Sequence, residues 1–317
     1  MGFFGDLTLI GVANGMVYAA VALSLVLIWR ATHVINFAQG ALATFTTYIA
    51  VSLLDRSVGY WGAFALALLA GFIFGALIVR LFIRPLTGRS ELHPVVVTIG
   101  LLILLEAVAG AIWGGGERGF QPAFSLSGII IHGTRLDFSH FDLFVLIAVL
   151  ALSVAILALF RYTDLGLRMR AAALDRDVAR LLGVRVAPLL TLGWALASLI
   201  GALAGLLVAP TVLLAPNNMD SVLVFGFAAA VMGGLESPFG ALVGGLTTGL
   251  AISYVTGYLG SDAGALVEAC ERLGEIDRSR CRAAVEGHFS VGRMVEEHVA
   301  LYKHAIEVHR TGSDRDG

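Results

Sequence analysis

Residues 7–29 read LTLIGVANGMVYAAVALSLVLIW, a predominantly apolar stretch without a charged side chain. A helix needs about 20 mostly apolar residues to cross the hydrocarbon core of a bilayer, so this stretch is long enough to span it. It is also longer than the apolar region of a typical secretory signal, and the preceding residues 1–6 contain no basic side chain. The sequence therefore predicts a first transmembrane helix that is retained.

The rest of the chain also has the composition of a membrane protein. Of its 317 residues, 58% are hydrophobic and 14% are charged, whereas an ordinary soluble domain is about 25% charged. A water-soluble fold of this length would have too little polar surface to cover so much apolar area. We predict an all-α fold, a polytopic transmembrane helix bundle of about eight membrane segments with a short soluble helical tail.

The scan for further segments finds one doubtful case, at 221–233. About a dozen residues cannot cross the hydrocarbon core, so this segment is expected to be re-entrant or buried among neighbouring helices. Glycines spaced by four predict close helix packing, and their density in 226–249 also suits a bent or broken segment. The predicted segments are 7–29, 34–54, 61–83, 94–113, 141–160, 187–209, 221–233 and 237–258.

Arginines are distributed unevenly between the loops. If the loop at 161–186 is cytoplasmic, the cytoplasmic side carries ten arginines and the outer side three. Cytoplasmic loops are enriched in positive charge, so this bias predicts that the N-terminus is outside. The ten are Arg30, Arg80, Arg84, Arg89, Arg161, Arg168, Arg170, Arg176, Arg180 and Arg185, and the three are Arg56, Arg118 and Arg135.

Charge density changes abruptly near Ser261. Residues 1–261 hold 13 Lys and Arg and 12 Asp and Glu, and the last 56 residues hold the other 8 basic and 11 acidic groups. We therefore expect a transmembrane domain at 1–260 and a charged soluble helical tail at 261–317. Cys270 and Cys281 match no zinc-binding spacing and are expected to be ordinary thiols, so neither a metal site nor a cofactor is expected.

Polar side chains at membrane depth are candidates for lining a translocation pathway, because such groups are costly in lipid. For the neutral ones, interhelical hydrogen bonding is an equally good interpretation. Glu106 stands out as an ionisable group within a span, although pairing with Arg80 or a position near a helix end would also explain it. The candidates are Asn14, Tyr18, Asn36, Gln39, Thr98 and Glu106.

The predicted cytoplasmic loop has a pattern typical of two short helices. Asp175 can cap the second helix, whose apolar positions Val178, Leu181 and Leu182 share one face, and Gly183 provides a C-terminal stop. One interpretation is a docking element that receives force from a cytoplasmic partner. The other is a basic loop that only determines the topology.

Several short motifs occur in order along residues 8–258. They are Asn14-Gly15 with Tyr18-Ala19, VINFAQG at 34–40, RPL at 84–86, TIGL at 98–101, GLRMRA at 166–171, ARLLGV at 179–184, and Met232-Gly233-Gly234 followed by Pro238, Gly240 and Gly244-Gly245. Together they resemble the permeases of ABC importers for branched-chain amino acids. That family more often has His at the position of Gln39 and an acidic residue at that of Ala41.

The resemblance implies an inner-membrane (cell-membrane) permease for branched-chain amino acids or similar small polar metabolites. Its implied partners are a second related permease subunit, two cytoplasmic ATPase subunits and a periplasmic or surface substrate-binding protein, besides the lipid bilayer; no nucleic acid is implied. Because Lys303 is the only lysine and lies in Tyr-Lys-His, the chain has no P-loop, and separate subunits are expected to hydrolyse ATP. No catalytic residue is expected, and the ATPase-coupling residues would be Gly166, Arg168, Arg170, Ala171, Asp175, Ala179, Leu182 and Gly183.

The tail departs from this resemblance. Around Phe289-Ser290 and Tyr302 it resembles the C-terminal end of a two-Rossmann-domain retaining glycosyltransferase, and we hypothesise that it is foreign to the permease, the product of a junction. Two alternative functions stay open. The bundle alone permits an ATP-independent channel or secondary carrier. The tail suggests a membrane-associated glycosyltransferase, but the residues before 261 show no donor-binding fold.

Overall fold

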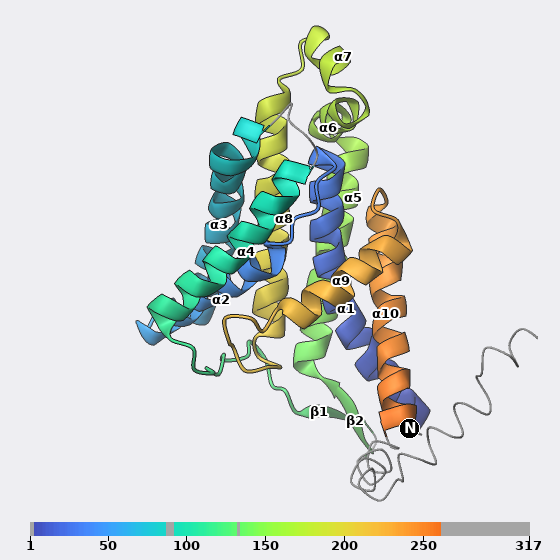
Figure 1. The fold of residues 1–317 in the computed structure, drawn as a ribbon. Coiled ribbons are helices and arrows are strands. Elements are labelled where there is room, and N and C mark those ends of the chain that lie inside the picture. The colour runs from blue at the N-terminus through green and yellow to red at the C-terminus, as the bar shows by residue number, and fades with distance from the viewer. Residues whose placement is uncertain (1–2, 87–91, 132–133, 261–317) are drawn as a thin grey trace, which may run out of the picture. The chain divides into compact units, whose positions relative to one another are not determined.

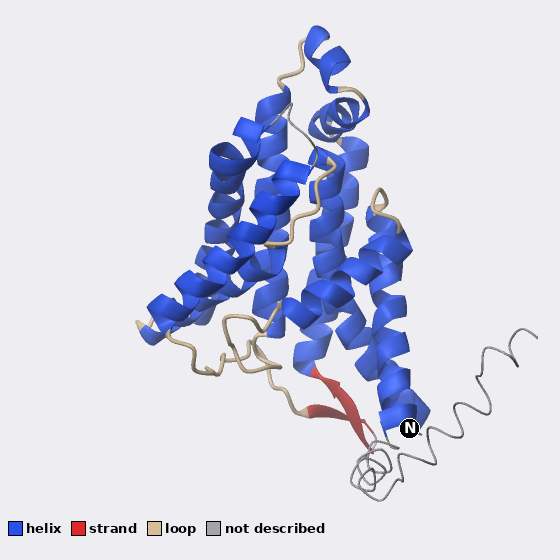
Figure 2. Ribbon diagram, in the orientation of Figure 1, coloured by secondary structure: helices blue, strands red, loops and turns tan. Residues whose placement is uncertain are grey.

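The computed structural model describes residues 3–86, 92–131 and 134–260. Ten α-helices and a short β-hairpin make up this part of the chain (Figures 1 and 2). The helices are α1 (Phe3–Thr32), α2 (Gln39–Asp55), α3 (Tyr60–Ile78), α4 (Leu92–Trp113), α5 (His140–Tyr162), α6 (Asp164–Leu174), α7 (Arg176–Leu181), α8 (Val186–Val208), α9 (Asp220–Gly233) and α10 (Pro238–Leu259). A π-helical turn (Val79–Ile83) and a 3-10 turn (Arg84–Leu86) extend α3, and strands β1 (Gly128–Ile131) and β2 (Thr134–Ser139) pair antiparallel.

The prediction of an all-α polytopic membrane protein is confirmed. Within the described residues, six helices are long and apolar enough to cross a membrane: α1, α3 with its extension, α4, α5, α8 and α10. The other two predicted segments form shorter helices. With 17 and 14 residues, α2 and α9 extend about 25 and 21 Å, less than the roughly 30 Å of a hydrocarbon core.

The shortness of α2 has a local cause. The predicted segment 34–54 is not helical throughout, because α1 ends at Thr32 and α2 begins only at Gln39. Figure 1 shows the chain turning back from the end of α1 into the middle of the bundle before α2 starts. Backbone in this break can be tolerated at membrane depth only where protein or water satisfies its polar groups.

Helices α1 and α8 form the centre of the bundle. The most apolar 18-residue stretch of α8 is 78% buried inside the protein, whereas that of α4 is 17% buried. Helix α8 is therefore an interior helix and α4 a peripheral one. Helix α8 packs against α1, α2 and α3, and α1 also packs against α5 and α9. Three buried apolar clusters follow this arrangement along the length of the bundle.

Glycines permit the closest of these helix contacts, as their spacing predicts. A methyl group placed on Gly75 of α3 would lie 2.5 Å from Ser198 Oγ and 2.6 Å from the Trp194 carbonyl oxygen, both on α8. One placed on Gly205 of α8 would lie 2.7 Å from the Ala43 carbonyl oxygen of α2. Small residues bring the backbones together where the hydrophobic effect gives helices no reason to associate.

The β-hairpin and the loop before it were not anticipated from the sequence. The loop that follows α4 is tied to the loop between α8 and α9 by an isolated antiparallel bridge between Arg118 and Leu214. The Arg118 side chain also donates a 2.7 Å hydrogen bond to the Trp113 carbonyl. The predicted tail at 261–317, with Cys270 and Cys281, and Arg89 lie outside the described residues.

The α3–α8 contact is tested by comparing two glycine substitutions. Gly75→Ala should destabilise the protein by about 1–3 kcal/mol, because the added methyl overpacks a tight contact. Gly100→Ala on α4 is the matched control, since a methyl there meets no atom within 4 Å and gains the same helix propensity. Thermal unfolding in detergent should show a lower midpoint for Gly75→Ala alone, and equal midpoints would contradict the contact.

Candidate coupling and translocation sites

The predicted coupling loop folds as two short helices, α6 and α7, at one end of the bundle (Figure 1). Thr163 caps α6, its side-chain oxygen accepting a 3.1 Å hydrogen bond from the Gly166 N–H. Gly166 itself lies directly against the backbone of Phe160, where any side chain would collide. Its role here is therefore to allow a sharp turn from α5 into α6.

The second short helix has the cap and the stop that the sequence predicts. Asp175 Oδ1 accepts a 3.0 Å hydrogen bond from the Val178 N–H at the start of α7. Gly183 adopts φ +83°, and the following Val184 N–H donates a 2.9 Å bond to the Ala179 carbonyl. This is a Schellman-type helix end, which glycine favours because it needs a left-handed residue.

The predicted coupling residues and their neighbours divide into a buried and an exposed set. Ala179 is buried with Met169 and Ala172 in a cluster that also contains Ile28 of α1 and Phe160 of α5. Arg168 and Arg170 are exposed, and Ala171 lies between these extremes. The buried set attaches the two helices to the bundle, and the exposed set is free to contact another molecule.

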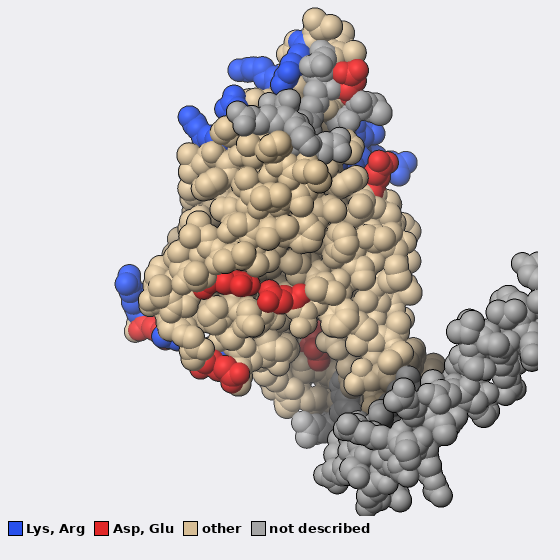
Figure 3. Space-filling view, viewed as in Figure 1, with Lys and Arg blue, Asp and Glu red and all other residues tan. Residues whose placement is uncertain are grey.

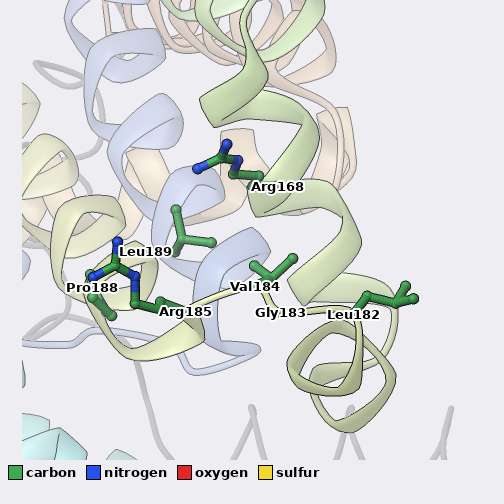
Figure 4. A pocket seen from close by; sticks show the side chains of 7 residues that line it. All are labelled: Arg168, Leu182, Gly183, Val184, Arg185, Pro188 and Leu189. Atoms are coloured by element: carbon green, nitrogen blue, oxygen red, sulfur yellow. The ribbon is translucent and has the colours of Figure 1, made fainter.

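We call the exposed apolar side chains of this end the α7 tip: Val178, Leu181 and Leu182. Their exposed fractions are 50%, 87% and 77%, which is unusual for large apolar side chains that share a face. Beside the tip, a cavity of about 530 Å³ lies between α6 and the start of α8 (Figure 4). It is lined by Arg168, Leu182, Gly183, Val184, Arg185, Pro188 and Leu189.

Arg30 connects this end to two other elements. At the end of α1, its guanidinium lies 4.6 Å from the ring centroid of Phe160 on α5. It also interacts electrostatically with Arg170 of α6 and with Glu236, in the turn between α9 and α10. Arg30 thus contacts α5 and interacts electrostatically with α6 and the α9–α10 turn.

Three of the predicted pathway candidates are fully buried and hydrogen-bonded to one another or to backbone. Asn36 donates from Nδ2 to Gln39 Oε1 at 2.9 Å and accepts from the Ala38 N–H at 3.1 Å. Gln39 Nε2 donates to the Ala197 carbonyl of α8 at 2.9 Å. Thr98 Oγ1 donates at 2.9 Å to the Val95 carbonyl of its own helix and lies 3.3 Å from the Ile35 carbonyl.

These contacts favour the hydrogen-bonding interpretation for Asn36, Gln39 and Thr98 in this conformation. Their exposed fractions are 1%, 1% and 0%, so none of them reaches an open surface. All three lie around the non-helical break between α1 and α2. Asn36 bonds to the backbone there, Thr98 lies beside a carbonyl of the break, and Gln39 links Asn36 to α8. Their place in a translocation pathway stays a prediction.

The other three candidates lie on accessible surface. Asn14 of α1 is exposed, and Tyr18 is half-buried with its ring centroid 5.3 Å from that of Phe225 on α9. Glu106 of α4 is half-buried, and its carboxyl interacts with that of Asp220, the first residue of α9. The group beside Glu106 is therefore another acid and not Arg80.

Asp220 is the residue that sequence reasoning missed. The available signal was its position, because it is the only charged residue of α9 and directly precedes the apolar segment 221–233. What the sequence could not indicate is its neighbour, which is 114 positions away. Figure 3 shows acidic atoms part-way along the bundle, over α4 and the start of α9, on an otherwise uncharged face.

Comparison with known proteins identifies the family. The model of the family described as branched-chain amino acid transport system / permease component matches residues 7–273. The chain belongs to this family. The match covers the described bundle from residue 7 onward and ends inside the charged tail; no resemblance of the tail to a glycosyltransferase is shown.

Relatives in three organisms extend this result. The chain is 31% identical over 253 residues to the probable branched-chain amino acid transport permease LivH of Methanocaldococcus jannaschii, covering 77% of this chain and 78% of that protein. It is 26% identical over 268 residues to the high-affinity branched-chain amino acid transport permease LivH of Escherichia coli K12 (80% and 86%). It is 24% identical over 263 residues to the corresponding permease BraD of Pseudomonas aeruginosa (77% and 83%). No solved structure matches.

The buried network is tested by substituting Gln39. Gln39→Ala should destabilise the permease by about 1–3 kcal/mol, because it leaves the buried Asn36 Nδ2 without its acceptor. Asn14→Ala, on an exposed position of α1, is the control and should leave thermal stability nearly unchanged. If both variants unfold at the wild-type midpoint, the network does not hold the break in place.

Proposed function

We propose that this permease is the membrane-spanning subunit of an ABC importer in which α6 and α7 dock an ATPase subunit. The observation that carries the proposal is the α7 tip, three large apolar side chains exposed at the end of the bundle where basic side chains gather (Figure 3). Burying a leucine side chain contributes about 1.5–3 kcal/mol. A cytoplasmic protein with an apolar groove and an acidic rim would complement this surface.

The contacts around α6 support a transmission role for it. Movement of α6 would act on α5 through the Gly166–Phe160 contact and on α1 through Met169 and Ala172. Arg30 would relay a change at Arg170 to the turn between α9 and α10, through Glu236. Rigid helices that pivot together in this way suit the rocking motion of an alternating-access permease.

Charge supports an inner-membrane orientation with the α6–α7 end in the cytoplasm. Figure 3 shows Lys and Arg side chains gathered mainly at this end, as the positive-inside rule requires. Helix α1 contacts α6 near its C-terminal end, so Phe3 at its other end would lie on the outer side. A substrate-binding protein would then deliver its ligand to the side of the N-terminus.

Branched-chain amino acids are the substrates that the relatives' names favour. We propose the same class for this chain, with two ATPase subunits, a second related permease subunit and a binding protein completing the importer. An ATP-independent channel or secondary carrier is the competing function. It would need neither a docking surface nor an ATPase partner, which makes the two functions separable by experiment.

The docking role is tested at the α7 tip. The double variant Leu181→Ser/Leu182→Ser should lose ATPase co-purification by about tenfold or more, because two buried leucines are lost from the interface. Leu213→Ser is a matched control, an exposed leucine in the loop between α8 and α9. Thermal unfolding of both should equal wild type. Retention of the ATPase by the double variant would reject this docking surface.

Charge reversal at Arg168 and Arg170 tests the same surface through transport. With the complete importer reconstituted in vesicles, ATP-driven uptake of labelled leucine should be abolished in the Arg168→Glu/Arg170→Glu variant. Unlabelled isoleucine and valine should compete with uptake by the wild type. Uptake that needs no ATP, or that survives the reversal, would favour the channel or carrier.

A further inference from the structure

Two carboxyl groups lie at lipid depth on one outer face of the bundle. Glu106 is seven residues from the C-terminal end of α4, which places it about 10 Å inside the span. Asp220 begins α9, and the two carboxyls interact. Glu106 Oε1 is buried and accepts no hydrogen bond from any residue that the structure describes.

These acids share their face with exposed apolar residues. On α4, Ile99, Ile103 and Glu106 are spaced by four and three positions and so lie on one side of the helix. On α9, Asp220 and Val224 are spaced by four in the same way. Ile99, Ile103 and Val224 have exposed fractions of 42%, 61% and 64%. We call this surface the α4–α9 face.

The exposed faces of α3 and α5 are suited to lipid, whereas the α4–α9 face is not. Helix α3 exposes Leu66, Leu69, Ile73 and Leu77, and α5 exposes Leu143, Ile147, Leu150 and Val154. Neither stretch, 60–79 nor 143–160, contains a charged residue. Ionisable side chains within membrane segments almost always face protein or a wet cavity, because lipid cannot solvate them.

The start of α9 provides a second, independent reason. This helix has 14 residues, too few to cross the membrane, and no side chain caps its first turn. A short helix that ends at lipid depth is tolerated only where protein or water covers it. Both observations therefore require that protein or water, and not lipid, lie against this surface.

We propose that the α4–α9 face is where the second, non-identical permease subunit packs, an inference that rests on the proposed function. A two-fold dimer of this chain would use the same patch twice and bring two acidic pairs into one interface. Like charges placed opposite one another oppose association. A related subunit with a basic or hydrogen-bond-donating group at this depth complements Glu106 and Asp220 instead.

Photo-crosslinking in the complete importer tests the proposal. The photoreactive p-benzoylphenylalanine is introduced at Ile103 or Val224, and at Val154 of α5 and Leu69 of α3 as controls of similar exposure. Irradiation should join the first two positions to the second permease, identified by its peptides, and should join neither control to it. Adducts from the controls alone, or adducts between two copies of this chain, would overturn the proposal.

A double substitution provides a measurement that does not depend on the probe. Glu106→Leu/Asp220→Leu should reduce co-purification of the second permease by about tenfold or more, because its complementary group loses its partners. Glu117→Leu, in the exposed loop after α4, is the control and should retain it. Undiminished co-purification by the double variant would mean that the face meets lipid.

Failure of the interface proposal can be distinguished from failure of the proposed function. ATPase co-purification and ATP-driven uptake are measured on the wild-type importer in the same preparation. If these persist while Ile103 and Val224 give no adduct, this inference fails and the importer assignment stands. If crosslinks form as expected while the Leu181→Ser/Leu182→Ser variant keeps its ATPase, the docking assignment fails and the interface stands.

Discussion

The structure depends on one constraint: backbone polar groups at lipid depth must find partners inside the protein. Six helices meet it because they are long enough to cross the membrane while their backbones remain hydrogen-bonded within the helix. The chain between α1 and α2 cannot, because residues 33–38 are not helical there. Within the break, the Asn36 side chain accepts from the Ala38 N–H, and the Thr98 hydroxyl lies within hydrogen-bond distance of the Ile35 carbonyl. Gln39 accepts from Asn36 Nδ2 and donates to the Ala197 carbonyl, and so fixes the break against α8. Polar residues predicted to line a pathway thus also repair an interruption in this conformation, and their pathway role stays a prediction.

This repair shapes the rest of the bundle. Because α2 begins in the interior, α8 has to approach it closely, and Gly201 and Gly205 leave room for Gln39 and for the backbone of α2. The same helix meets α3 through Gly71 and Gly75. The centre is therefore held by backbone proximity and buried hydrogen bonds, and the peripheral helices remain less constrained. Such a division suits a transporter, in which outer helices must move against a stable centre.

The two proposed interaction surfaces, the α7 tip and the α4–α9 face, each expose side chains that do not suit the solvent around them. At the α7 tip, apolar side chains project into what should be water, which indicates a partner. On the α4–α9 face the mismatch is reversed, because two carboxyls lie at a depth where lipid is expected and Glu106 Oε1 is buried without a hydrogen bond from any described residue. In each case the residues are unsuited to the solvent expected at that depth. A partner protein that supplies the missing environment resolves both mismatches.

Much of this was predictable from local sequence. The apolar runs indicated the spans, glycines spaced by four indicated close contacts, and the Asp175 cap and Gly183 stop delimited α7, because each rule operates within a turn or a span. The short family motifs, each a few residues long, likewise indicated the permease family from the sequence alone. Pairings between distant segments were not predictable, since they depend on how helices pack. Only the tertiary structure set Gln39 against Ala197 and Asp220 against Glu106. The sequence by itself determined which segments enter the membrane. Helix packing decided which polar side chains form hydrogen bonds inside the bundle and which remain at its surface.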